Sequence, residues 1–143
     1  MLMPDVNILV GAWNSADPQH DGLKDWLNDA LMSGDGLLIS SLVMSGVMRL
    51  LTNPHVLSRP MATSDALDNI DRLLSAPRTS LVHPGVRHYE IFTDLCRQVN
   101  ARGNLISDAQ HAALAIEHKA TWVTLDSDFA KFSGLRWVSP VAG

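Results

Sequence analysis

Four aspartates stand beside the most regular apolar segments of the chain, where a buried carboxylate is costly. Asp5 lies in the apolar segment 3–10, Asp108 opens an alanine-rich segment, and Asp126 and Asp128 follow the apolar run 121–125. Clustered carboxylates repel one another, so a site that gathers several of them is stable mainly when a cation occupies it. Because hard oxygen ligands select Mg²⁺ or Mn²⁺, the pattern predicts a divalent-cation site.

Two of these aspartates also have a simpler structural explanation. Asp108 falls in the expected first turn of a helix, where the helix dipole favours a negative charge by about 0.3–1 kcal/mol. Asp128 is well placed to cap a short helix at residues 129–132. Asp5 has no such explanation, because an unpaired carboxylate in an apolar strand costs several kcal/mol unless a cation or hydrogen-bond donors satisfy it. The metal hypothesis therefore rests most on Asp5.

Apolar periodicity predicts strands that alternate with helices. Strands are expected at residues 2–6, 37–40, 80–83 and 121–125, with a final apolar run at 135–138, and helices around 23–31, 43–50, 67–74, 92–99 and 109–116. Such alternation predicts an α/β fold in which helices cover both faces of a parallel sheet. The last helix is expected to start at a capping box formed by Ser107 and Gln110. Since the carboxyl ends of parallel strands share one edge, Asp5 and Asp126 are predicted to meet there.

Composition predicts one compact domain over residues 1–143. The chain has 46% apolar and 18% charged residues, which suffices for a hydrophobic core. No apolar run approaches the roughly 20 residues of a membrane span, and the first residues lack the basic flank of a signal peptide, so we expect a cytoplasmic protein without membrane contact. The single Cys96 fits this expectation and is read as a core position. With a net charge of −4, any binding of nucleic acid must be local.

Several motifs along the chain resemble those of PIN domains, in particular the VapC toxins of type II toxin-antitoxin modules in a subgroup common in mycobacteria. The resemblance covers nearly the whole chain and is carried, in order, by Asp5-Val6-Asn7, Arg49-Leu50-Leu51-Thr52-Asn53-Pro54, Ser107-Asp108-Ala109, Thr124-Leu125-Asp126-Ser127-Asp128-Phe129 and Gly134-Leu135-Arg136-Trp137. It implies a three-layer fold with a central, mainly parallel five-stranded sheet flanked by helices. It also implies a Mg²⁺- or Mn²⁺-dependent endoribonuclease that acts on tRNA or rRNA, forms a homodimer and is inhibited by a VapB-type antitoxin.

The resemblance assigns roles to the four aspartates. Asp5, Asp108 and Asp126 correspond to catalytic metal ligands, and Asp128 to an outer or alternative ligand. Metal-assisted hydrolysis of a phosphodiester needs no His or Ser nucleophile, because the metal supplies the activated water and stabilises the leaving oxygen.

Other polar residues are candidates for supporting roles. By the same resemblance, Asn7 and Thr124 orient carboxylates or water. The guanidinium of Arg49 is suited to bind a phosphate, although a solvated surface position explains it equally well. Four arginines make the segment 78–102 locally basic, and at least two of them are expected to be ordinary surface residues. The six histidines form no zinc pattern with Cys96 and are read as structural.

One position departs from the PIN pattern and leaves other functions open. PIN domains usually carry a Glu where this chain has Gly46, although the resembling subgroup often lacks it too. If the loss abolishes metal binding, the domain is a non-cleaving module that binds RNA or protein. A third possibility is a phosphatase with Asp5 as nucleophile. That reaction requires a nearby lysine, and Lys24, Lys119 and Lys131 are all expected to lie away from the strand ends.

Overall fold

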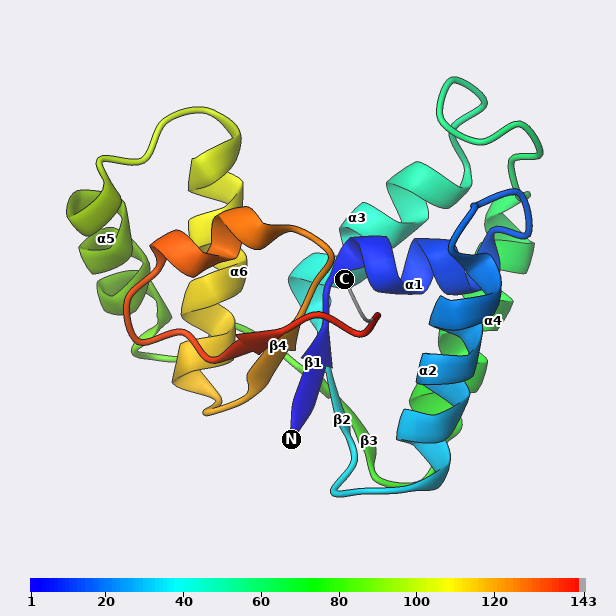
Figure 1. Ribbon diagram of the computed structural model, residues 1–143, viewed down its shortest axis with the longest axis horizontal. Helices are drawn as coiled ribbons and strands as arrows, with labels where there is room; N and C mark the ends of the chain where they lie inside the picture. The colour runs from blue at the N-terminus through cyan, green and yellow to red at the C-terminus, as the bar shows by residue number, and fades with distance from the viewer. Residues whose placement is uncertain (142–143) are drawn as a thin grey trace.

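The computed structural model describes residues 1–141 and alternates short strands with helices (Figure 1). Most predicted elements are present, with bounds that differ by a few residues. In chain order they are β1 (Leu2–Pro4), α1 (Val6–Trp13), α2 (His20–Met32), β2 (Leu37–Ser40), α3 (Ser41–Leu51), α4 (Thr63–Ser75), β3 (Thr79–Val82), α5 (His88–Val99), α6 (Asn104–Glu117), β4 (Thr121–Val123), the 3₁₀ helix η1 (Ser127–Lys131) and β5 (Trp137–Val138).

The five strands form one sheet in the order β3-β2-β1-β4-β5, and every neighbouring pair is parallel. Leu2 of β1 lies opposite Leu37 of β2 on one side and Thr121 of β4 on the other. The chain builds outward from β1 to β3 and then returns to the other side of β1. This reversal makes the gap between the carboxyl ends of β1 and β4 the topological switch point, where parallel sheets bind their ligands.

Helices cover both faces of the sheet, as predicted for the α/β class. In Figure 1, α5 and α6 lie on one side and α1 to α4 on the other. The first group packs as a helical hairpin, while α1 contacts both α2 and α3. The core between these layers is apolar, and its largest fully buried side chains include Trp122, Phe129 and Met3. None of the helices in the described residues is long and apolar enough to cross a membrane.

The structure corrects two predicted boundaries at the site. The first strand ends at Pro4, and the apolar residues after Asp5 form α1 rather than continuing a strand. Asp5 is thus the N-cap of a helix, which is a favoured position for aspartate. The capping box at Ser107 and Gln110 is also wrong, because α6 starts at Asn104, after Gly103, whose positive φ of 55° suits glycine.

Candidate active site

Asp5 lies at the switch point and is held by two short hydrogen bonds. The backbone N–H of Val6 donates to Asp5 Oδ1 over 2.6 Å, and the hydroxyl of Thr124 donates to Oδ2 over 2.6 Å. Thr124 directly follows β4 and is fully buried, so a buried hydroxyl fixes the carboxylate at the end of the neighbouring strand. The two strand ends therefore meet as predicted, and Thr124 is the residue that joins them.

Burial perturbs the acidity of Asp5. Desolvation raises the pKa of its carboxyl from 3.8 to about 6, and the nearby charges of Asp108 and Asp126 act in the same direction. The hydrogen bonds from Thr124 and Val6 oppose this shift without cancelling it. A carboxylate that is buried among other carboxylates gains the most from a cation, because a cation removes the repulsion and the desolvation penalty together.

Asp108 and Asp126 approach Asp5 from two further elements. The pKa of the half-buried Asp108 is raised by burial, then by the charges of Asp126 and Asp128, and is lowered by Lys131. Asp126 caps η1, its Oδ1 accepting a hydrogen bond of 2.9 Å from the backbone N–H of Asp128. The predicted cap at Asp128 is wrong, since Asp126 takes that position. The four aspartates nevertheless act electrostatically on one another as a single cluster.

The predicted position of Lys131 is wrong. The sequence predicts all three lysines away from the strand ends, yet η1 folds directly after β4 and brings Lys131 close enough to lower the pKa of Asp108. Lys131 is the only cation among the causes that shift the pKa of Asp5 or Asp108. Because the cluster has four carboxylates and Lys131 carries only one positive charge, the negative charge of the cluster is incompletely compensated.

The donor chemistry of the cluster fits a hard divalent cation. Its ligand atoms are mostly carboxylate oxygens, and the side-chain oxygen Oδ1 of Asn7, two residues after Asp5, is buried without a hydrogen-bond partner among residues 1–141. Among residues 1–141, no three Asp, Glu, His or Cys side chains are arranged to hold a metal ion as they stand. Both Asp5 oxygens instead accept protein hydrogen bonds, so ligation would use their remaining lone pairs.

A groove of about 450 Å³ runs beside the acidic cluster, between α3, α6 and the start of α1. Val6 and Ser107, the chain neighbours of Asp5 and Asp108, belong to its lining, which connects the groove to the acids. Arg49, exposed on α3, lines the same groove. A phosphate bound by Arg49 would lie in a groove that adjoins the carboxylates.

Sequence comparison agrees with this geometry. The family model for the PIN domain matches residues 2–135. The chain is 38% identical over its whole length to the VapC ribonuclease Mb2897 of Mycobacterium bovis, covering 97% of that protein. It is 36% identical to the ribonuclease VapC37 of Mycobacterium tuberculosis over 99% of each chain. This chain belongs to the PIN-domain family.

Solved structures share the fold of this PIN domain at lower identity. The crystal structure of VapBC2 from Rickettsia felis, bound to a DNA fragment from its promoter, has a TM-score of 0.73 and 21% identity, with 96% of this chain and 97% of that chain aligned. The sarcin-ricin loop cleaving toxin VapC20 of Mycobacterium tuberculosis has a TM-score of 0.70 and 17% identity over 95% and 99% of the two chains. The predicted three-layer PIN-like fold is confirmed.

Gly46 is the position at which the resemblance to PIN domains leads us to expect a Glu. It lines the groove on α3 and packs against α1, and a Cβ placed there would lie only 2.9 Å from Cγ2 of Val6. Real Cβ contacts are almost never so short. Close packing of α3 on α1 therefore leaves no ready space for a side chain at this position.

His111 is a groove residue that sequence reasoning missed. Its ring stacks on Trp122, with centroids 5.4 Å apart, and it lines the groove one helical turn after Asp108. The spacing of three residues on α6 is the signal that could have identified it. Three other histidines fit the structural reading, because each has a ring nitrogen within hydrogen-bond distance of a backbone carbonyl oxygen: His20, His88 and His118.

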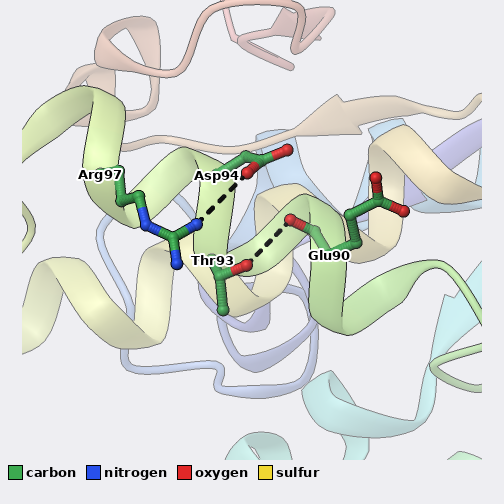
Figure 2. Close-up of polar contacts among 4 residues, drawn as sticks. All are labelled: Glu90, Thr93, Asp94 and Arg97. Atoms are coloured by element: carbon green, nitrogen blue, oxygen red, sulfur yellow. Dashed lines mark hydrogen bonds and ion pairs between the residues drawn. The ribbon is translucent and has the colours of Figure 1, made fainter.

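Two arginines of the basic segment 78–102 have structural partners within the described residues. Arg78 donates to the backbone carbonyl of Gly34 over 2.8 Å. Figure 2 shows Arg97 facing Asp94 one turn earlier on α5, with 3.5 Å between Nη1 and Oδ1. Both members of this pair are exposed, so the pair adds little stability. At least these two arginines are thus ordinary surface residues, as expected.

Proposed function

We propose that this PIN domain is a metal-dependent endoribonuclease, the toxin of a VapBC-type toxin-antitoxin module. The observation that carries the proposal is the acidic cluster at the switch point, with Asp5 at its buried centre. The relatives that share 31–38% of its sequence are named as VapC ribonucleases, which supports RNA as the substrate. Mg²⁺ or Mn²⁺ is the cofactor that suits these oxygen donors.

Each polar residue of the site has a distinct task in this proposal. Asp5, Asp108 and Asp126 would hold the cation, with Asp128 as an outer or alternative ligand. When bound, a divalent cation polarises the phosphate and activates water for hydrolysis. Thr124 holds Asp5 in place with its hydroxyl proton and accepts a hydrogen bond of 3.1 Å from the backbone N–H of Asp126. One hydroxyl therefore sets the relative positions of two of the acids.

Arg49 would bind the RNA phosphate from the groove. Its guanidinium can donate two parallel hydrogen bonds to an anion, whereas the protein as a whole carries a net charge of −4 and repels a polyanion. Phosphate binding of this kind holds the RNA in position without reading its sequence. Asn7, whose buried Oδ1 has no partner within the described residues, would orient a carboxylate or a water molecule.

The same charges suggest how the enzyme would be inhibited. Without metal, the clustered acids attract a basic side chain, and an antitoxin of the VapB type would supply one. Solved structures with this fold include VapBC complexes, among them the Rickettsia felis complex. We place the enzyme in the cytoplasm, with its tRNA or rRNA substrates, and expect a homodimer.

Cleavage of purified total tRNA and rRNA tests the proposal. The wild-type protein and Asp5→Asn are incubated with Mg²⁺, Mn²⁺ or EDTA, and the fragments are resolved on a denaturing gel. Discrete fragments that require metal and are absent with Asp5→Asn support the nuclease. Equal fragments from both proteins would overturn the assignment of Asp5.

The non-cleaving binding module remains a second candidate. It is favoured by Gly46 in place of the usual Glu and by the absence, among residues 1–141, of a ready-made ligand set. A pure binding module would retain RNA in a filter assay and leave it intact with every metal tested. EDTA would then leave RNA binding unchanged, and the RNA would stay intact with or without it.

A further inference from the structure

The groove beside the acidic cluster is lined by polar side chains that could recognise a base, in addition to Arg49, which could bind a phosphate. On α3, the lining residues fall at positions 41, 42, 45, 46 and 49, which lie on one face of a helix. On α6, the lining residues are Ser107, Gln110 and His111, again on one face. Hydroxyl, amide and imidazole groups thus face one another across a floor that Gly46 leaves without a side chain.

The state of His111 is fixed by its surroundings. Burial lowers the pKa of its imidazole to about 4, so the ring is neutral at physiological pH. Its Nδ1 atom is buried and has no hydrogen-bond partner in the part of the chain that the structure describes. A neutral imidazole carries its proton on one nitrogen only. With the proton on Nε2, the buried Nδ1 keeps a bare lone pair, which costs less than an orphaned N–H.

The ring is also packed against aromatic neighbours. His111 stacks on the fully buried Trp122, with 20° between the ring planes, and Trp122 in turn packs against Phe129. A neutral ring fixed in this way is unsuited to bind a phosphate through charge. It is suited to offer one directional hydrogen bond to an uncharged polar group.

We propose that the groove between α3 and α6 binds the nucleoside next to the scissile phosphate of single-stranded RNA, with His111 as a specificity-determining residue that reads the base. Arg49 holds the adjoining phosphate, while Ser45 and Gln110 supply further polar contacts to the base or ribose. The absence of a side chain at Gly46 keeps the floor of this subsite open. The inference rests on the proposed ribonuclease activity and assigns the groove within it.

Size and position support a nucleoside as the occupant. A volume of about 450 Å³ lies within the roughly 300–1,000 Å³ of small-ligand sites. Asp108 and His111 are one turn apart on α6, so a base at His111 would place its phosphate beside the acidic cluster. Unstacked bases of single-stranded RNA expose the polar edges that such a groove can bind.

Sequencing of cleavage ends tests this subsite directly. An RNA pool with a randomised single-stranded loop is cut by wild type, His111→Phe and the control His55→Phe, and the base preference at each position around the cut is counted. Phe keeps the stacking on Trp122 and removes both ring nitrogens, so the fold is expected to survive. His55 lies in an exposed loop outside the groove.

The expected result is a change in preference at one position adjacent to the cut. His111→Phe should lose roughly two- to tenfold of that preference, the effect of one hydrogen bond, while still cleaving RNA, and His55→Phe should match wild type. An unchanged preference in His111→Phe would overturn the subsite and leave the ribonuclease standing. A wild-type protein that cuts no RNA would instead count against the proposed function.

A binding measurement decides the matter even without cleavage. The four nucleoside 5′-monophosphates contain no phosphodiester to cut, so each can be titrated with Mg²⁺ present while the histidine ring resonances are followed by NMR. We expect the His111 resonance to shift with some bases more than others and the His55 resonance to stay fixed, and Arg49→Gln to weaken the response. Equal shifts for all four bases, or none, would contradict the inference.

Discussion

Asp5 combines burial with negative charge, and the consequences appear at the scale of single atoms. The residue is 7% exposed, and its carboxylate accepts hydrogen bonds from Val6 and Thr124 and has a pKa raised to about 6 by desolvation. The unfolded chain would ionise Asp5 near pH 4. Ionised Asp5 therefore costs the metal-free fold stability, which is the usual condition of a residue held for function rather than for stability.

The pH dependence of stability follows from this shift. Between pH 4 and 6 the unfolded chain has released the Asp5 proton while the folded protein keeps it, so the contribution of Asp5 to the stability of the metal-free fold falls as pH rises through this range. At about 1.4 kcal/mol per pKa unit, the loss is about 3 kcal/mol. Asp5→Asn should therefore raise the melting temperature in EDTA at pH 7.5 by several degrees and have little effect at pH 4.

Thermal melts across pH measure this effect. Asp94→Asn, on the exposed face of α5, is the matched control and should follow the wild-type curve. Equal melting temperatures of Asp5→Asn and wild type in EDTA at pH 7.5 would show that Asp5 is not held as a costly buried charge.

Thr124 offers a second test at the residue scale. Thr124→Val keeps the shape of the side chain and removes the hydroxyl that bonds both Asp5 and Asp126. Leaving these partners unsatisfied should cost about 1–3 kcal/mol and reduce cleavage roughly 10–100-fold. Thr124→Ser retains the hydroxyl and should restore most activity in the same single-turnover assay. A Ser variant as inactive as the Val variant would refute the role of the hydroxyl.

At the scale of elements, the packing of α3 against α1 determines which substitutions Gly46 tolerates. Ala is a better helix former than Gly by about 1 kcal/mol, yet a Cβ at Gly46 would press on Val6 Cγ2 at 2.9 Å. Overpacking typically costs about 1–3 kcal/mol. Gly46→Ala should thus lower the free energy of unfolding, and Val6→Ala should relieve the loss in the double variant.

Denaturant melts of the two single variants and the double variant form a complete cycle. A coupling energy near zero would mean that α1 and α3 separate easily, and a Glu at Gly46 would then be tolerated. A double variant that is more stable than the sum of the two single effects predicts would confirm that Gly46 packs closely on Val6. This packing leaves no space for a Glu at position 46.

The loop between β3 and α5 provides another test at the element scale. Glu117 at the end of α6 accepts hydrogen bonds from the backbone N–H groups of Gly85, at 2.8 Å, and Arg87, at 3.0 Å. Glu117→Ala removes both acceptors, so hydrogen exchange at these two amides should become at least several times faster while amides in β1 are unchanged. Unaltered exchange at Gly85 would show that the loop is held by other contacts.

The sequence predicts the order of elements better than their ends. All five strand positions and the helices from α2 to α6 follow from apolar periodicity, but α1 is missed because Val6, Ile8 and Val10 favour a strand. The helix N-cap role of Asp5 is the local signal that competes with this preference. The groove is beyond sequence patterns, since only tertiary packing brings Arg49 and His111 to one surface.

At the scale of the whole molecule, charge and topology act together. The sheet order places the ends of β1 and β4 side by side, and α6 and η1 bring Asp108 and Asp126 to the same point. The resulting cluster is acidic in a protein with a net charge of −4, so RNA must be recruited by local cations such as Arg49. Arg49→Gln should weaken RNA binding and reduce its salt dependence, whereas Arg72→Gln, outside this groove, should do neither.

The central claim is that the acidic cluster performs metal-dependent RNA hydrolysis, and single-turnover cleavage by Asp108→Asn tests it most directly. Asn keeps the volume of Asp108 and removes its charge, and Asp94→Asn is the matched control. With saturating Mn²⁺, Asp108→Asn should lose at least the roughly 10–100-fold that follows loss of an outer-shell partner, while Asp94→Asn cleaves like wild type. An Asp108→Asn protein that stays folded and cleaves at the wild-type rate would contradict the account.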